Sequence, residues 1–166
     1  VDPRRFGRID CTTEANINEH KFFKDLGPEP LLMKKLGAHL FEKSRKRKQP
    51  IKSFIMDAKN VVGVGNIYAS EALFRTGVKP SRSAHSLNQE TYAHLAKHIQ
   101  ATLKDAIKAG GTTFRDYKSL QGESGYFAVK LSVYDRKAEP CLQCTTPIKQ
   151  LVQAGRSTYF CPTCQT

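Results

Sequence analysis

Two Cys-x-x-Cys pairs near the end of the chain constrain its fold more than any other feature of the sequence. Cys141 and Cys144 form the first pair, Cys161 and Cys164 form the second, and sixteen residues separate the two pairs. Four thiolates with this spacing are typical of a tetrahedral zinc site with no open coordination position. The sequence therefore predicts one structural zinc ion, held by a hairpin whose strands cover 148–153 and 157–160.

The four cysteines are also compatible with two roles that need no metal. The pairs could form two disulfides, or one pair could be a thioredoxin-like redox site. Zinc is favoured because both pairs share one motif and no βαβ pattern surrounds them. The fifth cysteine, Cys11, stands apart, and we expect it to be a small buried apolar residue.

The charge of the chain indicates a polyanionic partner. Lys and Arg number 27 against 15 Asp and Glu, which gives a net charge of +12 and an isoelectric point near 9.6. Nucleic acid is the leading candidate. A membrane surface is less favoured, because the basic residues do not follow one face of an amphipathic helix. The densest basic run, residues 43–48, is on its own as typical of a solvated loop or a targeting signal as of a binding site.

No apolar run approaches the roughly 20 residues that a membrane span needs, and the N-terminus lacks the pattern of a signal peptide. We therefore expect a monomeric cytoplasmic protein without a membrane partner.

Hydrophobic periodicity predicts a mainly helical chain. The helices expected from apolar spacing and from Gly and Pro punctuation cover a segment from Pro30 toward Phe41, 51–59, 67–76, 87–109 and, more briefly, 114–120. Asn66 is expected to cap the helix 67–76, and Ser86 with Gln89 to form a capping box. Residues 129–134 alternate like a strand.

A Gly-Val-Gly turn, 63–65, separates the second and third of these helices. Backbone N–H groups of such a turn and of the following helix N-terminus can hold a phosphate without any side-chain charge. On its own a turn of this kind is more often a packing device, but the net charge of the chain favours DNA.

Several motifs occur together in the order found in one enzyme family: 2–7 (DPRRFG), 26–31 (LGPEPL), 61–71 (VVGVGNIYASE), 125–127 (GYF) and the cysteine pairs. With these motifs the chain resembles bacterial formamidopyrimidine-DNA glycosylase over essentially its whole length. The resemblance implies a mainly α fold, with a helix-two-turn-helix domain followed by a C-terminal zinc finger on a small β-hairpin. It further implies a remnant of the N-terminal domain and a linker at 1–22, the helical domain at 23–120, and a lesion loop with the zinc finger at 121–166.

The resemblance also implies an activity and a partner. Enzymes of this family excise 8-oxoguanine and ring-opened purines, then cut the backbone at the abasic site by β,δ-elimination. The partner would be double-stranded DNA that contains oxidised purines or abasic sites.

Residues are assigned by the same resemblance. Asn66 and Arg156 would grip phosphates that flank the lesion, Lys48 and Lys52 would add contacts, and Arg156 would also donate the proton in δ-elimination. Arg4 and Phe6 would enter the duplex, and the loop 121–125 would close over the everted base. Without the resemblance, Arg156 is interpreted as a solvent-facing turn residue, Phe6 as a core residue and 121–125 as a plain surface loop.

One departure from the family bears on activity. The family nucleophile is an N-terminal proline followed by a glutamate, whereas Pro3 of this chain is internal and has no free amine. We therefore expect a fragment that binds damaged DNA without catalysis. Two alternatives are an endonuclease VIII-type glycosylase for oxidised pyrimidines and a non-catalytic zinc-ribbon module that binds nucleic acid.

Overall fold

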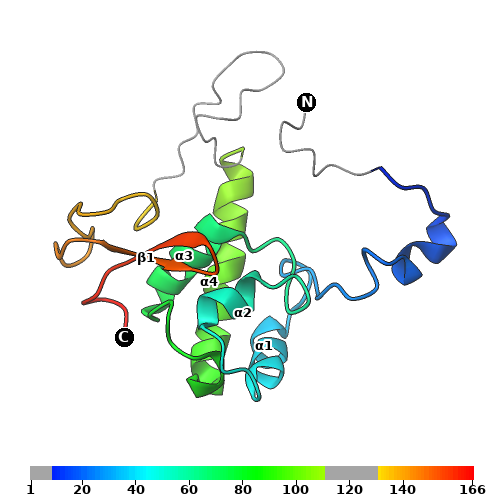
Figure 1. Cartoon of the computed structure of the whole chain (residues 1–166), viewed down its shortest axis with the longest axis horizontal. Coiled ribbons are helices and arrows are strands. Elements are labelled where there is room, and N and C mark those ends of the chain that lie inside the picture. Colours follow the sequence, from blue (N-terminus) through cyan, green and yellow to red (C-terminus); the bar gives the residue numbers. More distant parts are fainter. Residues whose placement is uncertain (1–8, 111–130) are drawn as a thin grey trace, which may run out of the picture.

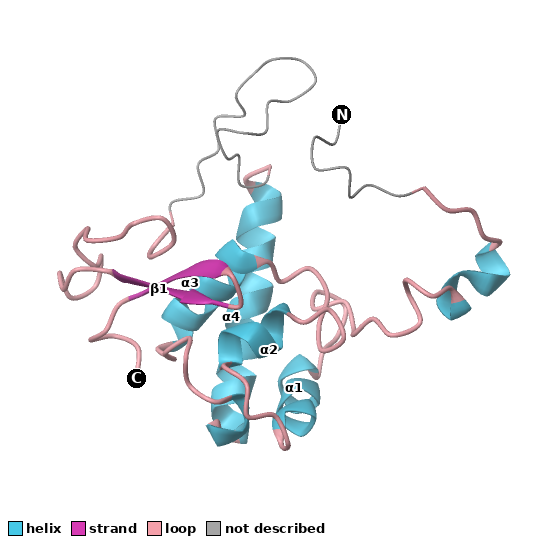
Figure 2. Cartoon of the chain, in the orientation of Figure 1, coloured by secondary structure: helices cyan, strands magenta, loops and turns pink. Residues whose placement is uncertain are grey.

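The computed structural model describes residues 9–110 and 131–166 (Figure 1). Arg4, Phe6, the expected short helix 114–120 and the loop 121–125 lie outside these residues. The part described consists of helices and a single antiparallel hairpin (Figure 2). The prediction of a mainly helical chain with a small β-hairpin is confirmed.

The elements lie close to the predicted ranges: α2, α4 and β1 are shorter than predicted, whereas α3 and β2 each begin one residue earlier. In chain order they are the 3-10 helix η1 (Glu14–Glu19), α1 (Leu36–Ser44), α2 (Ile51–Met56), α3 (Asn66–Thr76), the 3-10 helix η2 (Ala84–Ser86), α4 (Gln89–Lys108), β1 (Lys149–Gln153) and β2 (Arg156–Phe160). The first helix starts later than expected, because 30–35 form turns. The second ends at Met56 because the backbone of Asp57 is extended.

Helix α4 is the longest helix of the described chain, and α1 and α3 pack against it. The apolar side chains between these helices form the main core, which includes Leu40, Phe54, Leu73, Leu95 and Ile99. These five residues have no measurable exposure. Burial of each such side chain stabilises the fold by roughly 1.5–3 kcal/mol. The helical body therefore has its own core, distinct from the hairpin.

The contact between α1 and α4 depends on Gly37. A Cβ atom at this position would lie 2.8 Å from the Cα of Ala93 on α4. The neighbour is backbone, so no side-chain rotation relieves the contact, and the two helices would have to move apart.

We expect Gly37→Ala to lower the free energy of unfolding by about 1–2 kcal/mol. Overpacking of this kind costs about 1–3 kcal/mol, which exceeds the gain in helix propensity of at most ~1 kcal/mol. Urea unfolding followed by circular dichroism measures the change. Glu42→Ala, at an exposed position of the same helix, serves as the control and should change stability by less than about 0.5 kcal/mol. Equal effects of both variants would contradict the close approach.

Two predicted helix caps are wrong. Asn88, and not Ser86, caps α4: its side-chain oxygen accepts from Thr91 N at 2.8 Å. Gly65 is the N-cap of α3, so Asn66 becomes the first residue of that helix. The predicted left-handed Gly77 is confirmed, with φ 76°.

The hairpin has a small core of its own. Phe74 of α3 packs there with Val133, Ile148 and Tyr159. The register pairs Lys149 with Phe160 and Gln153 with Arg156. Phe74 thus joins the hairpin to the helical body.

Two further expectations are not met. Residues 131–134, the described part of the expected strand 129–134, form bends and a turn. Cys11 is exposed rather than buried, in a segment before α1 that extends away from the helical body (Figure 1). Within 9–110 and 131–166, no helix combines the length and the hydropathy needed to cross a membrane.

Candidate nucleic-acid interface and metal centre

The four cysteines of the two Cys-x-x-Cys pairs converge on one point. Their sulfur atoms all lie within 4.8 Å of one another. The Sγ atoms are 3.9 Å apart in Cys141 and Cys164, and 3.4 Å apart in Cys144 and Cys161. Sulfurs held about 2.3 Å from a tetrahedral zinc ion are about 3.8 Å apart, whereas a disulfide bond is about 2.05 Å long. The donor set fits a zinc ion and does not fit two disulfides.

The metal centre is fastened to the end of α3. The buried side chain of Gln165 accepts from Cys161 N at 2.9 Å and donates to Val78 O at 2.9 Å. Thr166 N also donates to Gly77 O at 3.1 Å. These hydrogen bonds fix the metal centre, and with it the hairpin, to the helices, which decides where the far end of the hairpin lies.

At the far end of the hairpin, Lys52 of α2 is 1% exposed. Its Nζ donates to Asn66 Oδ1 at 2.7 Å, to Thr158 Oγ1 at 2.8 Å and to Ser157 O at 3.2 Å. All three hydrogens of the ammonium group are used, so Lys52 joins α2, α3 and β2. Burial, and secondly the positive charge of Arg156, lower the pKa of Lys52 to about 8.

Asn66 completes this junction from the start of α3. Its Nδ2 donates to Ser157 O at 3.1 Å and to Tyr134 Oη at 3.2 Å. The amide thus ties α3 to the hairpin and to the segment before it. The first N–H groups of α3 have no intrahelical acceptor and point out of the helix at the same place.

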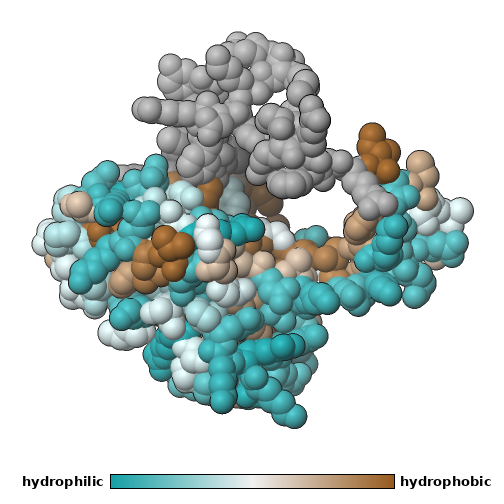
Figure 3. All heavy atoms as spheres, in the orientation of Figure 1, coloured by the Kyte–Doolittle hydropathy of each residue, from teal (hydrophilic) through white to brown (hydrophobic). Residues whose placement is uncertain are grey.

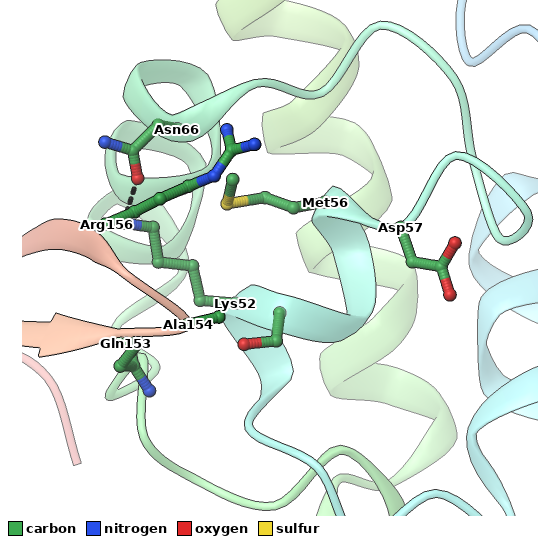
Figure 4. Close-up of a pocket in the computed structure, with 8 residues that line it drawn as sticks. Lys52, Met56, Asp57, Asn66, Gln153, Ala154 and Arg156 are labelled. Carbon is green, nitrogen blue, oxygen red and sulfur yellow. Dashed lines mark hydrogen bonds between the residues drawn. The ribbon is translucent and has the colours of Figure 1, made fainter.

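A hollow of about 150 Å³ opens at this junction, and we call it the α3 hollow. Its lining includes Lys52, Met56, Asn66, Gln153 and Arg156. The side chains of Lys52, Asn66 and Arg156 converge there from three elements (Figure 4). Two cations and a helix N-terminus make the α3 hollow suitable for an anion such as a phosphate.

Asp57, the carboxylate that also lines the α3 hollow, does not cancel this charge at close range. Its carboxylate points away from Lys52 and Asn66 (Figure 4). Its Oδ1 accepts from Lys59 N at 3.0 Å, which closes the turn after α2.

The structure brings together three of the six predicted DNA-contacting residues, namely Lys52, Asn66 and Arg156. Lys48 is exposed and does not line the α3 hollow. Its carbonyl accepts from Ser83 Oγ at 2.9 Å. Arg4 and Phe6 lie outside the described residues.

Glu71 is a functional candidate to which no sequence motif assigns a role. It is 3% exposed, and its carboxylate accepts from three successive backbone N–H groups, of Ser132 at 2.8 Å, Val133 at 2.9 Å and Tyr134 at 3.0 Å. These bonds fix Tyr134, whose hydroxyl meets Asn66, and they explain why 131–134 is not a strand. The sequence does carry one indication of this role: Glu71 directly precedes the apolar run 72–74, which suggests burial, and a buried carboxylate needs hydrogen-bond partners.

We expect Glu71→Gln to lower the free energy of unfolding by about 1.5–3 kcal/mol. The amide keeps the shape of the side chain, but its NH₂ group faces a backbone donor, and hydrogen bonds to charged groups contribute about that much. Urea unfolding measures the loss. The control is Glu42→Gln, an exposed carboxylate without a side-chain partner among the described residues. If Glu71→Gln is as mild as this control, the carboxylate does not anchor 132–134.

Two protein-family models match this chain, one over the helical part and one over the zinc hairpin. Residues 26–118 match the model of the formamidopyrimidine-DNA glycosylase H2TH domain. Residues 138–166 match that of the zinc finger found in FPG and IleRS. This second match, with the spacing of the four sulfurs, confirms the prediction of one structural zinc ion.

Relatives agree along nearly the whole chain. The formamidopyrimidine-DNA glycosylase of Thiobacillus denitrificans is 49% identical over 164 residues, which cover 99% of this chain and 60% of that protein. The enzyme of the same name from Ralstonia pickettii is 48% identical over 166 residues, 57% of its length. The chain therefore spans about 60% of the length of these relatives.

Solved structures of enzymes from the same family are also similar to this chain. MutM (Fpg) of Thermus thermophilus superposes with a TM-score of 0.88 at 39% identity, over 99% of this chain and 62% of that one. The Lactococcus lactis Fpg bound to DNA with an abasic site superposes with a TM-score of 0.83 at 33% identity, over 92% and 56%. The chain belongs to the formamidopyrimidine-DNA glycosylase family and carries the helix-two-turn-helix domain and the zinc finger of that family.

Proposed function

We propose that this chain is the DNA-binding part of a bacterial base-excision-repair enzyme, and that it grips the phosphate backbone beside a damaged nucleotide. The observation that carries the proposal is the meeting of Lys52, Asn66 and Arg156 at the N-terminus of α3. Action on bacterial DNA corresponds to a cytoplasmic location.

The contacts support distinct roles for the three residues. Arg156 is exposed, and its guanidinium has no partner among the described residues, so it is available for a phosphate oxygen. The first N–H groups of α3 supply further donors. Asn66 can exchange its 3.2 Å bond to Tyr134 for a bond to phosphate, because charge-assisted hydrogen bonds are the stronger ones. Lys52 acts mainly by holding Asn66 and the hairpin in place, and by its charge.

The activity of the parent enzyme follows from the family. We propose excision of 8-oxoguanine and formamidopyrimidines, followed by β,δ-elimination at the abasic site with Arg156 as the proton donor for the second elimination. Relatives have been solved with DNA that contains Fapy-dG or a carbocyclic 8-oxo-G, which supports this substrate class. The structural zinc ion takes no part in these steps, because its four thiolate ligands leave no open position.

Two alternatives are less well supported. An endonuclease VIII-type preference for oxidised pyrimidines shares the same DNA-binding elements, but the relatives described above carry the formamidopyrimidine name. A non-catalytic zinc-ribbon module does not account for the match of residues 26–118.

Binding to duplexes with and without an abasic-site analogue tests the proposal. Wild type should prefer the abasic duplex, and Arg156→Ala should weaken binding to it by about 1.5–3 kcal/mol, the worth of a charged hydrogen bond. Lys97→Ala, at an exposed position of α4, is the control for loss of one positive charge. If wild type binds both duplexes with equal affinity at several salt concentrations, the proposal is wrong. A general basic surface binds DNA only through salt-dependent contacts with phosphates and shows no preference for the abasic site.

A second experiment tests catalysis. Borohydride should not trap this chain on DNA that contains 8-oxoguanine, since Pro3 has no free amine. Efficient trapping would show that another amine of the chain forms a Schiff base.

A further inference from the structure

A second basic hollow adjoins the α3 hollow, and we call it the α1 cleft. It encloses about 600 Å³ between residues 24–28, one side of α1 and the turn after α2. Its Lys and Arg residues are Lys24, Lys43, Arg47 and Lys59. Asp57 lines both hollows, so the α1 cleft begins where the α3 hollow ends.

The basic surface continues past the α1 cleft. Lys43 and Arg47 also line a groove around the C-terminal end of α1, which we call the end groove, together with Glu42, Arg45 and Lys46. These shared residues connect the α3 hollow, the α1 cleft and the end groove into one surface. Helix α1 has nine residues, so it adds roughly 13 Å to the length of this surface.

The walls of the α1 cleft are held together by specific contacts. His39 Nε2 lies 3.0 Å from Asn60 O, which joins α1 to the turn after α2. Gly27 N donates to Ala58 O at 2.7 Å, and a Cβ on Gly27 would lie only 2.5 Å from the carbonyl carbon of Asn60. The three walls are therefore in fixed positions relative to the α3 hollow.

The positive charge of this surface is only partly neutralised. Asp25 lies 3.7 Å from Lys59 Nζ, Asp57 also lines the α1 cleft, and Glu42 lines the end groove. Lys43, Lys46 and Arg47 are exposed, and within 9–110 and 131–166 their side chains form no ion pair or hydrogen bond. The face over α1, at the lower centre in Figure 3, is hydrophilic. Three cations without partners along one surface raise the local potential for a polyanion.

We propose that the α1 cleft and the end groove bind the phosphate backbone of the same DNA duplex, several nucleotides away from the lesion. The inference rests on the proposed function, because it takes the α3 hollow as the point where the lesion-flanking phosphates sit. A duplex suits this surface better than a small anion, since the cations are spread along an open surface and a duplex carries one charge per about 1.7 Å of its axis.

The test uses the whole chain and the double variant Lys43→Gln/Arg47→Gln. Affinity is measured against salt concentration for two duplexes with a central abasic-site analogue, one of about 10 base pairs, which is one helical turn, and one about three times longer. On the long duplex the slope of log affinity against log salt should fall by about 1.8, since each phosphate contact contributes about 0.9. On the short duplex the slope should stay within error of the wild type.

The matched control is Lys97→Gln/Lys104→Gln, which removes two exposed charges from α4. It should leave both slopes unchanged, which separates local contact from a change in net charge. An unchanged slope of the Lys43/Arg47 variant on the long duplex, with the preference for the abasic site retained, would overturn this inference and leave the proposed function intact. If the wild-type chain itself shows no preference for the abasic duplex, the result contradicts the proposed function instead.

Discussion

Removal of the zinc ion should unfold the hairpin and abolish specific DNA binding while the helical body stays folded. Structural zinc contributes about 10–16 kcal/mol of binding free energy in small finger domains, which is comparable to the whole stability of a typical domain, about 5–15 kcal/mol. The hairpin core is small and includes Cys141 and Cys161 themselves. Without the metal, Arg156 and Thr158 lose their positions, whereas the core between α1, α3 and α4 contains no zinc ligand.

Cys161→Ser provides the measurement. We expect less than one zinc per chain, retention of most of the helical circular dichroism signal and a DNA affinity reduced to the salt-dependent level of an unspecific basic surface. Cys11→Ser is the matched control, because Cys11 is exposed and takes no part in the four-sulfur cluster. Preserved recognition of the abasic duplex by a zinc-free chain would contradict the role of the hairpin.

Replacement of Lys52 by Met should weaken DNA binding more than it affects stability. The substitution leaves Asn66 Oδ1 and Thr158 Oγ1 without their buried donor, so the side chains of the α3 hollow lose their fixed geometry. A misplaced Asn66 amide no longer reaches the phosphate, and loss of that charged hydrogen bond to DNA costs about 1.5–3 kcal/mol, which corresponds to roughly 10-fold to 100-fold in affinity. Stability changes less, because Met also removes a charge whose burial is unfavourable.

The pH dependence distinguishes this role from a purely structural one. The pKa of Lys52 is lowered from 10.5 to about 8 in the folded chain, so between pH 8 and 10.5 the unfolded chain binds more protons, and the contribution of Lys52 to stability rises with pH. DNA binding should change in the opposite direction, because a nearby phosphate favours the protonated amine. We expect wild-type affinity for the abasic duplex to fall between pH 7.5 and pH 9.5 and that of Lys52→Met to stay flat. A parallel fall in both proteins would assign the pH effect to other groups.

The local patterns of the sequence predicted most of the secondary structure. Apolar spacing located the four main helices to within a few residues, apart from the start of α1, and Gly77 ended α3 in the left-handed conformation. One error occurred where two polar residues competed for one role, and another where a distant side chain took the backbone hydrogen bonds. Asn88 replaced Ser86 as the cap of α4, because only its side chain meets Thr91 N. The alternation in 129–134 suggested a strand, but in 131–134 the carboxylate of Glu71 takes the N–H groups that a neighbouring strand would have bound.

The sequence by itself determined the metal ligands, the helical body and the family, because these depend on residues that lie close together in the chain or in one motif. Only the tertiary structure decided that the ammonium group of Lys52 is buried between Asn66 and the hairpin, and that the basic run after α1 continues the surface that starts at Arg156. The physical reason is that a charged side chain has its surroundings set by segments distant in sequence: Lys52 and Thr158 are 106 residues apart, and no local pattern encodes their meeting.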